Sequence, residues 1–134
     1  TAIEKTGAGK LIANTVINSA GKDVSPFVLL VVVFTIACIL TNFMSNTATT
    51  ALLVPVSISI ATGMGADPRA VIMATVIGGS CAYSTPIGMP ANTMVLGPGG
   101  YNFTDYVKAG FPLQIIAAIV SFVLLPIFFP FFPK

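Results

Sequence analysis

A dense cluster of hydroxyl and amide side chains, Thr41 to Thr50, lies in the middle of a long uncharged stretch of this chain. No acidic or basic residue occurs from Val24 to Ala66, so the cluster falls at the depth of a membrane interior. A polar group in hydrocarbon is costly unless a partner satisfies it. The cluster therefore indicates a bound solute, a bound ion or a seam between packed helices, and we favour the first two.

A second irregular segment follows at 84–92, where two prolines and a glycine fall within five residues. That composition cannot continue an α-helix. The chain thus has two interruptions at membrane depth, near Ser45 and near Gly88. Irregular backbone is tolerated there only when it is buried in protein or lines a watery cavity. Two broken segments that meet at mid-bilayer are typical of the binding site of a secondary transporter.

The helices that arrive at the interruptions end in unpaired carbonyl groups, which carry partial negative charge. A hard cation such as sodium takes several oxygen ligands. We predict a sodium site made by the side chains of Thr41, Ser45 and Asn46 and by backbone carbonyls near Gly88. We expect no other metal and no organic cofactor, since the chain has no histidine and its two cysteines lack metal-binding spacing.

The helices that leave the interruptions begin with free N–H groups, whose partial positive charge binds anions without a basic residue. The uncharged runs contain no lysine or arginine that could do so. We predict an anion between the tip Ser45-Asn46-Thr47 and the loop that carries Met89 and Pro90, beside the sodium ion. For Thr49 and Thr50 we favour helix packing, because small hydroxyl residues are common between transmembrane helices.

Composition defines the class of protein: 55% of the residues are hydrophobic and only 7% are charged, against about a quarter in soluble domains. Charge-free runs occupy 24–66, 70–104 and 109–133, and each exceeds the roughly 20 residues that span a bilayer. The sequence therefore predicts an integral membrane protein. The net charge of +2 is too small and too scattered to suggest nucleic acid as a partner.

Four elements must position these residues. Ser25-Pro26 and Asp67-Pro68 each supply an N-cap residue followed by proline, which is a helix start. Helical pieces are predicted at 26–43, 48–62, 68–83, 91–96 and 109–129. They form a re-entrant hairpin at 23–66, a broken transmembrane helix at 67–100, and an interfacial turn with a last transmembrane helix at 101–134. An interfacial arm helix at 1–22 precedes them. The first segment also fits the end of a transmembrane helix followed by a loop.

These motifs resemble a known family. The segment Leu40-Thr41-Asn42-Phe43-Met44-Ser45-Asn46-Thr47-Ala48 resembles the Ser-Asn-Thr hairpin of the divalent anion:sodium symporters, a family that includes bacterial dicarboxylate transporters. The segment 80–92 is similar to the broken helix that faces this hairpin. The opening Glu4-Lys5-Thr6-Gly7 and the turn Gly97-Pro98-Gly99-Gly100-Tyr101 are also similar to members of that family.

The resemblance implies an all-α membrane protein in which this chain is the C-terminal inverted repeat. It implies a missing N-terminal half with a second Ser-Asn-Thr hairpin, a homodimer of the full-length protein, and a bacterial inner membrane. The implied activity is sodium-coupled uptake of a small divalent anion by alternating access, with sodium as the coupling ion. Met89 stands where dicarboxylate carriers often have a small hydroxyl residue, and Ala91 replaces a frequent proline. The 97–101 turn is closer to sulfate-type permeases, so dicarboxylate and sulfate both stay open.

Two other functions fit the same residues. A sodium-independent exchanger or a channel would use the same helix ends, and a structural membrane subunit would use the polar residues only for packing. An enzyme is not expected, because the chain has no histidine, no carboxylate within its apolar runs and no cysteine–base pair for acid–base chemistry.

Overall fold

The computed structural model describes residues 25–132, and the regular structure in that range is entirely α-helical. Five helices follow in chain order: α3 Pro26–Thr41, α4 Asn46–Gly63, α5 Arg69–Gly79, α6 Pro90–Leu96 and α7 Phe103–Phe128. This agrees with the all-α class expected from the sequence. The predicted arm helix at 1–22 lies outside the described residues.

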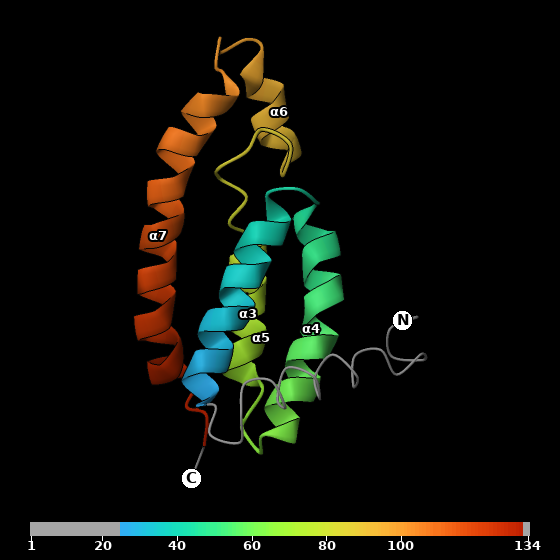
Figure 1. Ribbon diagram of the computed structural model, residues 1–134, viewed down its shortest axis with the longest axis vertical. Helices are drawn as coiled ribbons and strands as arrows, with labels where there is room; N and C mark the ends of the chain where they lie inside the picture. Colours follow the sequence, from blue (N-terminus) through green and yellow to red (C-terminus); the bar gives the residue numbers. More distant parts are fainter. Residues whose placement is uncertain (1–24, 133–134) are drawn as a thin grey trace.

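Helices α3 and α4 form a helical hairpin, lying side by side in opposite directions (Figure 1). The Ser25 hydroxyl accepts from the N–H of Phe27 at 3.3 Å and caps α3. The Ser45 hydroxyl accepts from the N–H of Ala48 at 3.2 Å and caps α4. The two helices lie where the helical arms at 26–43 and 48–62 were predicted. Helix α3 ends at Thr41 and α4 begins at Asn46, each about two residues earlier than expected.

Helix α5 packs against both arms of the hairpin (Figure 1). At Gly78 a Cβ atom would come within 2.8 Å of the Phe34 carbonyl oxygen, so α5 and α3 approach backbone to backbone. The close helix packing that small residues permit is therefore present. The apolar core beside this contact consists of Leu30, Phe34, Ala70, Ala74, Cys81 and Leu125.

Helix α5 ends at Gly79, four residues before the predicted end at 83. The N–H of Ser80 turns back to the Ile77 carbonyl at 3.0 Å, and the N–H of Cys81 turns back to the Gly78 carbonyl at 3.1 Å. The chain then runs without helix until α6 begins at Pro90. The broken segment predicted at 67–100 thus has a longer irregular part than the sequence indicated.

Helix α7 begins at Phe103, six residues before the span predicted from 109. Asn102 and Asp105 form a capping box, in which the N–H of Asn102 donates to the Asp105 carboxylate at 2.8 Å. The predicted interfacial turn is therefore largely the first turns of this helix. With 26 residues, or about 39 Å at 1.5 Å per residue, α7 has the length and composition to cross a membrane. Helices α3 and α5 are apolar but shorter.

Candidate functional site

The tip of the hairpin contacts the end of α5 through the hydroxyl of Thr41, which is fully buried. Its Oγ1 atom lies 2.7 Å from Asn46 Oδ1 and 2.6 Å from the carbonyl oxygen of Gly79. A threonine hydroxyl has one hydrogen, so it donates to only one of these two oxygens at a time. Three oxygen atoms from three parts of the chain therefore share a single proton.

The loop between α5 and α6 packs directly on the hairpin tip. At Gly88 a Cβ atom would lie 2.5 Å from the Thr41 carbonyl oxygen and 3.2 Å from Asn42 Cα, so this approach requires glycine. The Thr85 hydroxyl donates to the Asn42 carbonyl at 2.5 Å, and the N–H of Gly88 donates to the Thr85 hydroxyl oxygen at 3.3 Å. The two interruptions that the sequence places near Ser45 and Gly88 are thus in contact.

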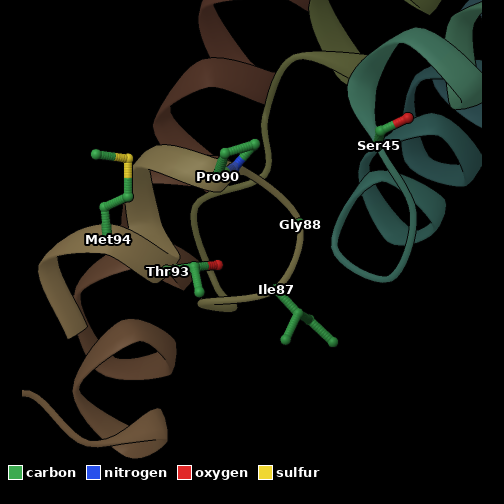
Figure 2. A pocket seen from close by; sticks show the side chains of 6 residues that line it. All are labelled: Ser45, Ile87, Gly88, Pro90, Thr93 and Met94. Atoms are coloured by element: carbon green, nitrogen blue, oxygen red, sulfur yellow. The ribbon is translucent and has the colours of Figure 1, made fainter. Parts of the chain in front are cut away.

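A cavity of about 450 Å³ opens between the tip, the loop and α6. Figure 2 shows Ser45 on the hairpin tip, with the Gly88 loop, Pro90 and Thr93 facing it across the opening. The described residues that line the cavity carry no formal charge; they are Ser45, Ile87, Gly88, Pro90, Thr93 and Met94. Thr93 faces the opening, whereas the Ser45 hydroxyl points to the first turn of α4, where it accepts from the N–H of Ala48 (Figure 2). The cavity is thus bordered mainly by apolar side chains.

The structure brings most of the predicted residues to this place. Thr41, Asn46 and Gly88 meet at the contact between tip and loop. Ser45 and Pro90 border the cavity. Gly88 belongs both to the cavity lining and to the contact between tip and loop. Their assignment as ligands remains a prediction.

Three predicted substrate residues, Asn46, Thr47 and Met89, do not line the cavity. Asn46 lies beside Thr41 instead. Thr47 is exposed in the first turn of α4, and Met89 is the N-cap residue of α6. Two helix N-termini were expected at this site. The second belongs to α6, which is a short helix of seven residues. The cavity is bordered instead by Ile87, Thr93 and Met94, which the sequence did not single out.

Side chains that hold the loop were also missed. Asn92 donates through Nδ2 to the carbonyl oxygens of Ala82 at 2.8 Å and Thr85 at 3.0 Å, and its own carbonyl accepts from the Tyr106 hydroxyl at 2.7 Å. On α7, Gln114 makes a similar pair of bonds to the same loop. An isolated amide in an apolar run was a usable signal, by the same cost argument that identified the tip.

A polar hairpin tip in contact with a broken helix, beside a 26-residue apolar span, describes part of an integral membrane transporter. Residues 1–131 match the family described as the sodium:sulfate symporter transmembrane region, and the chain belongs to that family. The resemblance to divalent anion:sodium symporters is thereby confirmed.

The relatives are transporters for the most part. The chain is 38% identical over 97% of its length to the uncharacterized transporter YfbS of Escherichia coli strain K12, covering 21% of that protein. It is 38% identical over 68% of its length to a putative sulfur deprivation response regulator of Chlamydomonas reinhardtii, covering 16%. It is 27% identical over 74% of its length to the sodium-dependent dicarboxylate transporter SdcS of Staphylococcus saprophyticus, covering 19%. The chain thus spans about a fifth of the curated relatives that it matches.

Proposed function

We propose that the chain is part of a secondary active transporter that couples sodium to uptake of a small divalent anion, either a dicarboxylate or sulfate, by alternating access. The family description and the name of the SdcS relative support this choice. We place the full-length protein in a bacterial inner membrane as a homodimer, with a second Ser-Asn-Thr hairpin in its N-terminal half. The observation that carries the proposal is the oxygen cluster at Thr41, where the two interruptions meet.

The sodium ion is held near the oxygens of Thr41, Ser45 and Asn46 and the backbone around Gly88. The donor set fits a hard cation, because the side-chain and carbonyl oxygens converge with too few hydrogens to satisfy one another. The carbonyl oxygen of Gly79 joins the proposed set, since it lies 2.6 Å from Thr41 Oγ1. A cation supplies the positive charge that this cluster of acceptors lacks.

The anion occupies the cavity beside the sodium ion, between the Ser45-Asn46-Thr47 turn and the segment of Met89 and Pro90. Ser45, the N-cap residue of α4, lines the cavity, so the N-terminus of this helix lies beside the proposed anion. A helix N-terminus is worth roughly 0.3–1 kcal/mol to an anion at an exposed site, which is too little for useful affinity. The neighbouring cation must therefore supply much of the attraction.

The test uses the full-length protein in lipid vesicles. Uptake of radiolabelled sulfate and of succinate is measured with sodium outside and with sodium replaced by potassium. We expect uptake of one or both anions to depend steeply on sodium. Equal uptake in the two media would favour the exchanger or channel.

Asn46→Ala tests the sodium ligands. Losing an interaction with a charged group removes about 1.5–3 kcal/mol, so we expect half-maximal uptake to need at least about tenfold more sodium. Thr62→Ala is the matched control, because the Thr62 hydroxyl is exposed at the far end of α4 and bonds only within its own helix. Unchanged transport after Ser45, Asn46 and Thr47 are all replaced by alanine would support the structural subunit instead.

A further inference from the structure

Gln114 is the only amide side chain in α7, and both ends of its amide are used. Its Nε2 donates to the carbonyl oxygen of Cys81 at 2.5 Å, and its Oε1 accepts from the hydroxyl of Ser84 at 2.8 Å. An amide in an apolar run is costly unless satisfied, and here it is satisfied by the loop between α5 and α6. One side chain of the last helix therefore holds that loop at two points.

Gly110 lies one turn before Gln114 on the same face of α7. It is buried, and a Cβ atom there would overlap the carbonyl group of Tyr83. The backbone of α7 thus contacts the loop directly at Tyr83. The Gln114 amide bonds Cys81, before Tyr83 in the chain, and Ser84, after it. Together they fix the position of the loop against the helix.

The segment held by Gln114 continues to the hairpin tip. The N–H of Ser84 donates to Asn42 Oδ1 at 3.1 Å, and Asn42 Nδ2 donates to the Cys38 carbonyl at 2.6 Å. Asn42 is only 7% exposed and directly follows Thr41. Hydrogen bonds therefore run without a gap from α7, through the loop, to the residue beside the proposed sodium ligand.

We propose that Gln114 is a positioning residue for this site, although it lies on a helix that contributes no ligand. By holding Cys81 and Ser84, it sets where the loop presents Gly88 to the tip, and so determines sodium affinity. The part of this inference that concerns sodium rests on the proposed function. The part that concerns the loop does not.

The first measurement is independent of transport. Hydrogen–deuterium exchange of segment 80–89 is followed in the full-length protein and in its Gln114→Ala variant. We expect faster exchange in the variant, because two bonds that hold the loop are lost. Ile116→Ala is the control: its side chain lies on the same helix, is 57% exposed and should leave the exchange unchanged.

The second measurement is sodium activation of anion uptake by the same proteins. We expect Gln114→Ala to raise the sodium concentration for half-maximal uptake about tenfold, which corresponds to 1.4 kcal/mol, while uptake at saturating sodium falls much less. Ser84→Ala removes one of the two bonds and leaves Gln114 in place. Ser84→Ala should shift sodium activation in the same direction by a smaller factor. This variant therefore tests the proposal even if Gln114→Ala fails to fold.

Gln114→Glu separates hydrogen bonding from mere filling of space. A protonated carboxyl group can donate to Cys81 and accept from Ser84, whereas an ionised one cannot donate. Sodium activation of sulfate uptake, taken relative to the wild type at each pH, should recover as the pH falls from about 8 to about 5.5. A role in packing alone gives no such pH dependence.

Unchanged exchange of segment 80–89 in Gln114→Ala would overturn the proposal, since the loop would not need the amide. Faster exchange with unchanged sodium activation would also overturn it, because the loop position would not affect the site. Absence of sodium dependence in the wild type would instead count against the proposed function, and the exchange measurement would still decide whether Gln114 holds the loop.

Discussion

At the scale of single residues, the approach of Gly88 to the hairpin tip leaves no room for a side chain. Gly88→Ala would place a methyl group 2.5 Å from the Thr41 carbonyl oxygen, so the loop or the tip must move. We expect a loss of about 1–3 kcal/mol in the stability of this contact, as for other overpacked sites. The full-length variant should show a lower thermal unfolding temperature and weaker sodium activation of uptake.

Gly97→Ala is the matched control for this change. Gly97 follows α6 with right-handed helical backbone angles, and a Cβ atom there would meet nothing within 4 Å. It should leave both the unfolding temperature and sodium activation near the wild type. If Gly88→Ala behaves like Gly97→Ala, the loop does not press on the tip as described.

Sequence reasoning found some of these residues and not others for a physical reason. Thr41 and Asn46 belong to a polar cluster in a charge-free run. The polar groups of such a cluster need hydrogen-bond partners or ligands within the membrane, so the sequence alone marks it as a candidate site. The Gly79 contribution is a backbone carbonyl, which every residue has and which no residue type marks. Gln114 left a signal, a lone amide among apolar residues, but its partners lie in another element.

At the scale of elements, the two arms of the hairpin are short for a bilayer. Helix α3 has 16 residues and α4 has 18, or about 24 Å and about 27 Å, against a hydrocarbon core of roughly 30 Å. We therefore expect a re-entrant hairpin that enters and leaves on one side. Single cysteines at Asp23 and Asp67, in a protein with Cys38 and Cys81 replaced by alanine, should react with an impermeant maleimide from the same side.

A cysteine at Tyr101 provides the reference for the other side. Tyr101 is exposed and lies in the segment between α6 and α7. That segment is at the opposite end of the described structure from the start of α5 (Figure 1). It should be labelled from the side opposite to Asp67. Labelling of Asp23 and Asp67 from opposite sides would mean that α3 and α4 are not both parts of a re-entrant hairpin.

Element boundaries were predictable where local chemistry sets them. The caps at Ser25 and Ser45 depend on residues next to them in the chain. The early end of α5 also involves a distant partner, because the carbonyl of its terminal residue Gly79 accepts from Thr41, 38 positions away. The start of α7 at Phe103 is also set locally, by the capping box of Asn102 and Asp105, although the span was predicted only from residue 109.

At the scale of the whole molecule, α7 buries only Gly110, Ser121 and Leu125 among its 26 residues. Its remaining surface is largely apolar, including Ile116 and Ile119, each 57% exposed. Such a surface suits hydrocarbon or further protein, and the chain spans only about a fifth of its relatives. The class of protein and the elements near the site could be predicted from this chain. The second Ser-Asn-Thr hairpin of the proposed site could not, because it is expected in another part of the full-length protein.

Adjacent sodium and anion sites predict a reciprocal linkage in the full-length protein. If sodium and the anion attract one another, the factor by which sulfate tightens sodium binding equals the factor by which sodium tightens sulfate binding. We expect a factor in the range of about 5 to 150. Titration calorimetry of each ligand, with and without the other, measures both factors, and a factor near one would place the two ligands apart.

The long-range bonds of the hairpin tip also have a consequence for biogenesis. Thr41 bonds to Gly79, Asn42 to Ser84 and Thr85, and that loop in turn to Gln114. A ribosome makes the tip before any of these later partners exists. A tip that entered the bilayer at once would carry unsatisfied polar groups into hydrocarbon. We therefore expect the hairpin to stay at the membrane surface during synthesis and to insert into the bilayer only after α7 has been made.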